Sequence, residues 1–188
     1  MYNICIISSS VRIDRMSHRA AMYFQNRLEA HPEFESEILD LKIYNFPIFE
    51  ERLRFLKNPD QKILDFAAKI KNSDAVLIVT PEYNGSMPAS LKNCIDLLYG
   101  EWKKKPVGII TCSSGSFGGA QVLGDLQFVL WKIGAHTIPA IFPIPKIQDV
   151  FDENGKANDP DAMTKRVEPF IGELMYWLQS RPARTTDV

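Results

Sequence analysis

The middle of the chain contains the apolar run Ala75-Val76-Leu77-Ile78-Val79-Thr80, followed at once by Pro81-Glu82-Tyr83-Asn84-Gly85-Ser86. The run is short, continuous and rich in β-branched residues, which predicts a strand covered on both faces. A helix is expected next, because Pro88 suits the first turn of a helix, where its missing N–H would be unpaired anyway. Open α/β sheets bind ligands in loops at the carboxyl ends of their strands, so residues 81–86 are the first candidate for a functional site.

Strand-like runs and helical segments alternate along the rest of the chain, as in repeated βαβ units around a parallel sheet. The expected strands are Asn3–Ser8, Glu35–Asp40, Ala75–Thr80, Val107–Thr111 and Thr137–Ile141. The expected helices are Ser17–Ala30, Pro59–Asn72, Pro88–Tyr99, Ala120–Ile133 and Pro160–Leu178. Right-handed crossovers favour an α/β fold with strand order 2-1-3-4-5, helices on both faces, and a crevice between the first and third strands. The second strand is the most polar, which suits a sheet edge.

The composition fits one compact domain that has no nucleic-acid or membrane partner. The chain has 188 residues, of which 45% are hydrophobic, and we expect a single domain over 1–180 with a flexible tail over 181–188. Its 22 basic and 23 acidic residues nearly balance, which leaves no electrostatic signature of nucleic acid or an anionic membrane. No apolar stretch has the length of a membrane span and the start lacks the basic region of a signal peptide, so a cytoplasmic location is expected.

The cysteines and histidines are scattered, and no cluster has the spacing of metal ligands, so no metal is predicted. The three cysteines are expected to be buried structural thiols rather than ligands, nucleophiles or disulfides: Cys5, Cys94 and Cys112. The three histidines are expected to be solvated or hydrogen-bonded: His18, His31 and His136.

The loop after the first strand, residues 8–17, has the parts of an anion site. Ser10 and Ser17 supply hydroxyl groups, Arg12 supplies a guanidinium group, and the N-terminus of the following helix supplies backbone N–H groups. Phosphate is the natural occupant of such a loop. The alternative is a serine-rich turn in which Ser17 merely caps the helix. The loop lacks the glycine patterns of a P-loop or of a dinucleotide-binding turn, which argues against a nucleoside triphosphatase.

Two further loops follow the third and fourth strands and suit a flat ligand. Residues 81–86 offer the ring of Tyr83, exposed backbone amides and the conformational freedom of Gly85, although a plain turn with a stacking tyrosine is the alternative. Residues 112–119 contain three serines and three glycines, which permit close backbone approach to a ring. All three loops are expected at one edge of the sheet, which predicts a bound mononucleotide, and FMN fits best.

The motifs in the first two loops resemble those of a known family. The hexapeptide, together with Pro88 and Leu91-Lys92-Asn93, is similar to the hallmark of the NADPH-dependent FMN reductases, flavodoxin-like proteins whose members include quinone, azo-dye and chromate reductases. Ser9-Ser10-Val11-Arg12, followed by Arg15 and Ser17, resembles the family's GSxR phosphate motif, with Ser9 where the family usually has glycine. The resemblance extends from the first strand to about Pro139.

The resemblance implies a flavodoxin-like three-layer sandwich with FMN as cofactor and NADPH or NADH as co-substrate. It implies phosphate contacts from Ser10, Arg12, Arg15 and Ser17. It implies contacts to the N5 side of the isoalloxazine from Pro81, Glu82, Tyr83, Asn84, Gly85 and Ser86, and to its pyrimidine edge from Ser113, Ser114 and Gly115. No residue is expected to be catalytic in its own right, because the flavin carries the chemistry.

The implied reaction passes hydride from NAD(P)H through FMN to a small acceptor, such as a quinone, azo compound, free flavin or metal oxyanion, in ping-pong turnover. A flavodoxin-type electron carrier is the main rival, but the nearly neutral charge disfavours it because such carriers are usually strongly acidic. A third hypothesis for the function is a regulatory domain that keeps the fold but binds no cofactor. The run Lys103-Lys104-Lys105 is expected to be a solvated turn, with contact to the NADPH phosphate as the alternative.

The helix expected at 120–133 has more apolar residues than one core-facing stripe needs. We therefore expect a homodimer or homotetramer in which a second subunit covers the remainder, and the family resemblance points the same way. The alternative is a helix buried between the sheet and the C-terminal helix.

Overall fold

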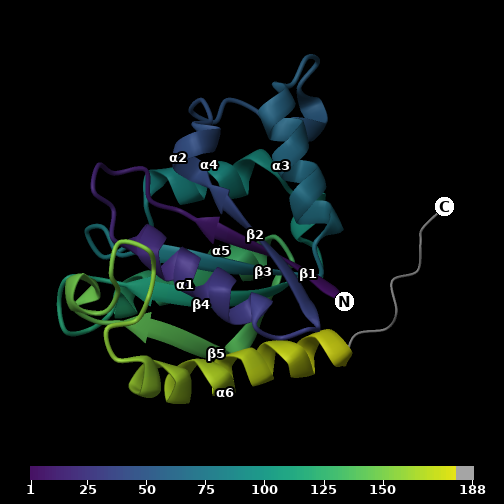
Figure 1. Cartoon of the computed structure of the whole chain (residues 1–188). Helices are drawn as coiled ribbons and strands as arrows, with labels where there is room; N and C mark the ends of the chain where they lie inside the picture. The colour runs from purple at the N-terminus through teal and green to yellow at the C-terminus, as the bar shows by residue number, and fades with distance from the viewer. Residues whose placement is uncertain (181–188) are drawn as a thin grey trace.

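A computed structural model of the chain describes residues 1–180; the tail predicted at 181–188 lies outside the described residues. Five strands form one sheet in which every neighbouring pair is parallel, in the order β2-β1-β3-β4-β5 (Figure 1). The strands are β1 (Tyr2–Ser8), β2 (Phe34–Asp40), β3 (Ala75–Pro81), β4 (Pro106–Cys112) and β5 (His136–Ile144). The predicted strand order is confirmed.

Helices cover both faces of the sheet and give the three layers that were expected (Figure 1). One face packs against α1 (Ser17–Glu29) and α6 (Pro160–Gln179), and the other against α3 (Gln61–Asn72), α4 (Ala89–Leu97) and α5 (Ala120–Lys132). β3 and β4 are buried along their whole length because they lie at the centre of the sheet between these layers. β2 lies at an edge and is only partly buried, as its polar sequence predicted.

The structure adds short elements that the sequence did not reveal. They are α2 (Leu41–Tyr44) and three turns of 3₁₀ helix, η1 (Leu53–Phe55), η2 (Gly100–Trp102) and η3 (Ile147–Asp149). α2 forms directly after β2 because the side chain of Asp40 accepts a hydrogen bond from the backbone N–H of Lys42 and caps it. β5 continues to Ile144, three residues past the expected end, because Ile144 still pairs with Cys112 of β4.

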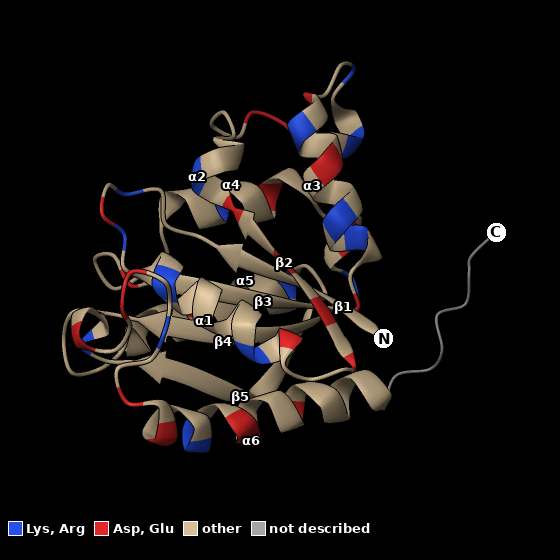
Figure 2. Cartoon of the chain, viewed as in Figure 1, with Lys and Arg blue, Asp and Glu red and all other residues tan. Residues whose placement is uncertain are grey.

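Charged residues of both signs are interspersed over the elements, as Figure 2 illustrates for α3 and α6. No helix within residues 1–180 combines the length and the apolar character that crossing a membrane requires. The three cysteines are buried, as expected. Burial raises the pKa of Cys5 to about 11 and that of Cys112 to about 12, and it raises the pKa of Cys94 as well, so the three thiols stay protonated.

The expectation of a solvated lysine turn is wrong for Lys105. Lys103 and Lys104 are exposed, but Lys105 is only 4% exposed. Its ammonium group donates hydrogen bonds to the carbonyl oxygens of Lys71, at 3.1 Å, and Ser73. These carbonyl groups lie at the C-terminal end of α3, where unpaired acceptors and the helix dipole favour a cation. The sequence could not reveal this partner because α3 ends more than thirty residues earlier in the chain, at Asn72.

Candidate active site

The three predicted loops meet beyond the carboxyl ends of the strands, where they line one crevice of about 250 Å³. In Figure 1 this edge is where the strand arrows end and the loops gather. The first loop contributes Ser10, Arg12, Ile13, Asp14, Arg15, Met16 and Ser17; the second contributes Pro81, Glu82 and Tyr83; the third contributes Cys112, Ser113 and Ser114. The predicted site residues outside the lining are Asn84, Gly85, Ser86 and Gly115.

A fourth segment, which the sequence did not predict to be part of the site, also lines the crevice. Ile147 and Gln148, in the turn after β5, belong to the lining. The side chain of Gln148 donates to the carbonyl oxygen of Ser114 at 3.4 Å, and the N–H of Ile147 donates to the carbonyl oxygen of Ser113 at 3.0 Å. The sequence could have indicated this segment, because the carboxyl end of the fifth strand of a parallel sheet lies at the same edge as those of the first, third and fourth strands.

The N-terminus of α1 opens into this crevice without a side-chain cap. Its N-cap residue is Met16, whose side chain makes no capping hydrogen bond. Ser17 is the first helical residue rather than the cap, and its buried hydroxyl has no hydrogen-bond partner among residues 1–180. The reading of Ser17 as a mere N-cap is therefore wrong. The N–H of Arg19 donates to the carbonyl oxygen of Met16 at 3.0 Å, but the earlier N–H groups of the first turn and the hydroxyl of Ser17 have unused donor capacity beside a cavity, which suits an anion.

Arg15 lies under the first loop and is committed to protein partners. Its guanidinium group forms a bidentate ion pair with the carboxylate of Asp40. It also donates a hydrogen bond to the carbonyl oxygen of Ser10 at 2.6 Å. The two charged side chains are 11% and 6% exposed, so the pair is largely withdrawn from water. Burial, the largest influence, would raise the pKa of Asp40, but hydrogen bonds from Arg15 and from the N–H of Lys42 outweigh it and the pKa is lowered.

His18 completes this buried group of polar side chains. Its Nδ1 shares a hydrogen bond with the hydroxyl of Ser8 at 3.0 Å and lies 3.8 Å from Asp40. Burial and then the charge of Arg15 lower the pKa of His18, against the opposing charge of Asp40. The histidine is therefore a hydrogen-bonded, neutral support for the first loop at physiological pH, as expected.

Arg12 behaves differently from Arg15, because it is exposed and forms no ion pair with any residue of the described chain. Its guanidinium group lies over the ring of Tyr83, 5.5 Å from the centroid. The hydroxyl of Tyr83 in turn shares a hydrogen bond of 2.7 Å with the hydroxyl of Ser10. The first and second loops are thus joined directly, and Arg12 keeps its charge available at the mouth of the crevice.

The second loop is a tight hairpin fixed by its own backbone. Tyr83 and Ser86 exchange hydrogen bonds of 2.9 and 3.1 Å. Asn84 and Gly85, between them, both have positive φ, 52° and 81°, as a two-residue type I′ turn requires. These two residues hold Tyr83 in place from outside the crevice, which explains why they do not line it.

Glu82 has a structural role that the sequence did not suggest. Its carboxylate accepts hydrogen bonds from the N–H groups of Gln121, at 2.8 Å, and Val122, at 3.3 Å. These are the second and third residues of α5, whose own N-cap, Gly119, offers no side chain. A carboxylate at a helix N-terminus satisfies unpaired donors and complements the dipole. Glu82 therefore couples the second loop to α5.

The third loop passes very close to its neighbours. Gly118 and Gly119 have φ of 63° and 82°, and a Cβ added at Gly119 would lie 3.1 Å from the carbonyl oxygen of Cys112. Both glycines are thus required by conformation as well as by space. The hydroxyl of Thr111 donates to the carbonyl oxygen of Gly118 at 2.7 Å and closes the loop.

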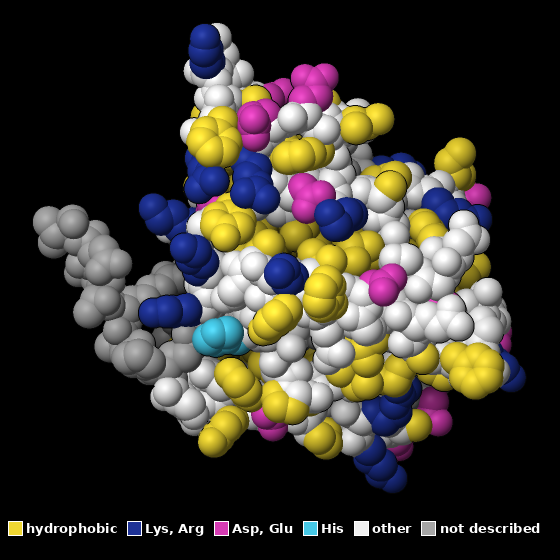
Figure 3. Space-filling model, turned by 180° about the vertical axis from the view of Figure 1, so that it is seen from behind, with side chains coloured by type: hydrophobic (Ala, Val, Ile, Leu, Met, Phe, Trp, Pro, Cys, Tyr) yellow, Lys and Arg dark blue, Asp and Glu magenta, His cyan; other side chains and the backbone are white. Residues whose placement is uncertain are grey.

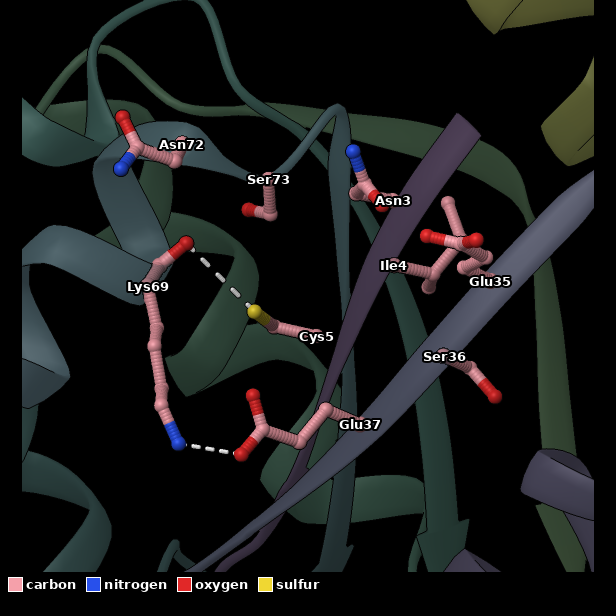
Figure 4. A pocket seen from close by; sticks show the side chains of 9 residues that line it. All are labelled: Asn3, Ile4, Cys5, Glu35, Ser36, Glu37, Lys69, Asn72 and Ser73. Carbon is pink, nitrogen blue, oxygen red and sulfur yellow. Dashed lines mark hydrogen bonds and ion pairs between the residues drawn. The ribbon is translucent and has the colours of Figure 1, made fainter. Parts of the chain in front are cut away.

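A second cavity, of about 310 Å³, lies away from these loops and does not qualify as a reaction centre. It lies along β1, β2 and the end of α3, and Figure 4 shows its lining. Lys69 reaches the carboxylate of Glu37, and the thiol of Cys5 is directed at the carbonyl oxygen of Lys69 at 3.5 Å. Lys69 and Glu37 are paired with each other and the thiol of Cys5 is protonated, so the cavity offers no nucleophile.

Comparison with known proteins decides the family. The family model described as NADPH-dependent FMN reductase matches residues 2–149, which include the first three loops of the crevice and its fourth segment. The chain belongs to the NADPH-dependent FMN reductase family. As the family is one of enzymes, the protein is an NAD(P)H-dependent oxidoreductase that uses FMN.

Relatives of similar length agree with this membership. A quinone reductase of Pseudomonas putida is 30% identical over 187 residues, covering 95% of this chain and 96% of that protein. An NAD(P)H-dependent FMN reductase of Schizosaccharomyces pombe is 32% identical over 190 residues, covering 96% and 92%. The structure is also similar to FerB, a flavoenzyme NAD(P)H:(acceptor) oxidoreductase of Paracoccus denitrificans, with a TM-score of 0.78, 26% identity, and coverage of 95% and 98%.

Proposed function

We propose that the crevice holds FMN with its phosphate at the first loop and its ring system against the second and third loops. The observation that carries this proposal is the uncapped N-terminus of α1 with the unpartnered hydroxyl of Ser17, in the same crevice as an unpaired Arg12 and the ring of Tyr83. An anion site and an aromatic surface lie together, as a flat mononucleotide requires.

At the phosphate end, we assign direct contacts to Ser10, Arg12, Ser17 and the first N–H groups of α1. Arg12 can rotate off the ring of Tyr83 toward a phosphate without breaking an ion pair. Arg15 already uses three of its five N–H donors within the protein, two on Asp40 and one on the carbonyl oxygen of Ser10, and the carboxylate of Asp40 offsets its charge. We therefore assign Arg15 to holding the carbonyl group of Ser10, and so the shape of the loop, rather than to the phosphate itself.

At the ring end, the second and third loops orient the flavin. When bound, FMN supplies the redox chemistry by taking up and releasing a hydride equivalent. Tyr83 is held by the hairpin turn and by Ser10, so it presents a fixed surface to the ring. Ser114 offers hydroxyl and backbone donors to the edge where negative charge develops on reduction, whereas the N–H of Ser113 donates to the carbonyl oxygen of Ile144 and its hydroxyl to that of Gly115, both at 3.2 Å. Gln148 supports Ser114 from the neighbouring segment.

Substitution of Arg12 tests the placement of the phosphate. Arg12→Ala removes a charge-assisted hydrogen bond and should weaken FMN binding by about 1 to 3 kcal/mol, or roughly 5- to 150-fold. The measurement is flavin fluorescence quenching on titration of the apoprotein with FMN. Lys132→Ala, which removes an exposed cation that also lies over an aromatic ring, is the matched control and should leave the affinity unchanged. Unchanged affinity in the Arg12 variant would show that the phosphate lies elsewhere.

We further propose that NAD(P)H and a small acceptor occupy the open side of the crevice in turn, which gives ping-pong turnover. The acceptor classes are quinones, azo compounds, free flavin and metal oxyanions, and the names of similar proteins include a quinone reductase and an azoreductase. Initial rates of NADPH oxidation at several quinone concentrations should give parallel double-reciprocal lines. Intersecting lines would mean that both substrates bind together. Absence of turnover by the FMN-loaded protein would favour an electron carrier instead.

We also propose that α5 contributes to a homodimer or homotetramer interface. Val122, Leu126 and Leu130 face the core, whereas Phe128 and Trp131 are 61% and 67% exposed with ring centroids 5.8 Å apart. The alternative of a helix buried under α6 is wrong, because α6 packs on the opposite face of the sheet. A single Phe128→Glu substitution should lower the mass measured by light scattering, and a wild-type mass of one subunit would remove the proposal.

A further inference from the structure

A third pocket, of about 240 Å³, lies outside the crevice, and three cationic side chains in its lining surround one tyrosine. Arg52 and Arg54 come from the segment around η1, and Tyr99, Glu101 and Lys103 come from the turn between α4 and β4. We call this site the basic pocket. Figure 3 shows Lys and Arg side chains gathered beside hydrophobic ones on the upper left of the rear face of the molecule.

Three positive charges converge on the ring of Tyr99. The guanidinium carbons of Arg52 and Arg54 lie 4.8 and 5.4 Å from its centroid, and the ammonium group of Lys103 lies 5.6 Å from it. None of the three side chains forms an ion pair within the described part of the chain. This separates them from the buried Arg15, whose charge is neutralised by Asp40.

The acid in the lining does not neutralise this cluster. The carboxylate of Glu101 accepts a hydrogen bond from the backbone N–H of Tyr99 at 3.0 Å and makes no ion pair with the three cations. The lining therefore carries three positive charges and one negative charge. Contact with an aromatic ring is worth only about 0.5 to 1 kcal/mol at an exposed site, so it does not use up the capacity of these groups to bind an anion.

We propose that the basic pocket binds a small phosphorylated ligand that carries at least two negative charges, of the pyrophosphate or polyphosphate type. Two arginines offer planar pairs of N–H donors that match phosphate oxygens, and the lysine offers a compact third charge. A pocket of this volume receives a compact anion rather than a flat extended surface. The excess of positive charge in the lining requires more than one negative charge on the ligand for neutrality.

This site is separate from the flavin crevice. Tyr99 and Lys103 precede the amino end of β4, whereas the crevice lies beyond the carboxyl ends of the strands. β4 has seven residues, and a strand of that length spans roughly 20 Å. The two sites also share no lining residue. The inference therefore goes beyond the proposed function and does not depend on where FMN binds.

Calorimetric titration of the FMN-saturated protein with pyrophosphate tests the proposal, with saturation by FMN keeping the crevice occupied. We expect saturable binding at one site per chain, with inorganic phosphate binding more weakly. Arg54→Ala and Lys103→Ala should each weaken pyrophosphate binding about tenfold or more. Tyr99→Leu should also weaken it, because the ring gathers the three cations. Amide chemical-shift changes on titration should centre on Tyr99 and Gly100.

Matched substitutions separate this site from general attraction to positive charge. Lys132 lies 5.4 Å from the ring centroid of Trp131, as Lys103 lies beside Tyr99, but no second cation from residues 1–180 lies over that ring. Lys132→Ala should leave pyrophosphate binding unchanged. The proposal is overturned if no saturable binding is found, if Lys132→Ala weakens binding as much as Lys103→Ala, or if Arg12→Ala abolishes binding while Arg54→Ala does not.

Discussion

Arg15 of the crevice and the two arginines of the basic pocket have opposite roles. In the crevice, Arg15 is largely withdrawn from water, paired with Asp40 and hydrogen-bonded to a backbone carbonyl group, so it maintains the shape of the loop. In the basic pocket, Arg52 and Arg54 lie against Tyr99 and have no carboxylate partner within residues 1–180. The difference indicates that a cation paired inside the protein maintains the position of a loop, whereas an accessible cation without an ion-pair partner is available to bind a ligand.

The largest effect should come from breaking the buried pair. Asp40→Ala leaves the guanidinium group of Arg15 without its partner and should lower the free energy of unfolding by about 3 to 5 kcal/mol. Urea denaturation followed by tryptophan fluorescence measures the loss. The control is Glu37→Ala, which removes the partner of the more exposed Lys69 and should cost no more than about 1 kcal/mol. Equal losses in the two variants would mean that Arg15 is not tied to Asp40 in solution.

A smaller effect should follow from altering the backbone of the crevice. Gly119→Ala places a Cβ on a residue with φ of 82° and within 3.1 Å of a carbonyl oxygen, and should cost about 1 to 3 kcal/mol. Gly124→Ala, in the interior of α5 with open space around it, should instead stabilise by about 0.5 to 1 kcal/mol. Thermal unfolding of the two variants should therefore shift in opposite directions. A shift of the same sign in both would contradict the close approach at Gly119.

Acid should weaken the support of the first loop, because Asp40 and His18, which lie 3.8 Å apart there, both have lowered pKa values. The lowered pKa of His18 means that its contribution to stability is complete above pH 6.5 and is lost as pH falls through the folded-state pKa. The lowered pKa of Asp40 means that its contribution is complete above pH 3.8 and is lost at lower pH. Urea unfolding between pH 8 and pH 5 should show the first loss, and His18→Gln should flatten it.

The smallest effect on stability should come from the basic pocket. Arg54→Ala removes one exposed charge and its ring contacts, and should change the free energy of unfolding by no more than about 1 kcal/mol. A change as large as that of Asp40→Ala would mean that the pocket is a structural element instead of a binding surface. Urea denaturation under the same conditions makes the two values directly comparable.

Much of the site was predictable because its loops follow strands. Residues 81–86 and 112–119 follow apolar runs that form the two central strands, and strand order then brings the loops to one edge. Arg15 was assigned to the phosphate through the family resemblance, and its pairing with Asp40 was missed. Asp40 ends β2, which lies beside β1 in the sheet, so the two residues meet although 25 positions separate them.

The sequence by itself determined the alternation of strands and helices, the order of the strands and the edge at which the three loops gather, because these follow from local periodicity and from the handedness of crossovers. Only the tertiary structure decided which charged side chains are paired within the protein and which remain available to a ligand. Asp40 neutralises Arg15, Glu82 caps α5, and the end of α3 takes up Lys105. Such pairings depend on distances between segments remote in the chain, and no local pattern of residues encodes those distances.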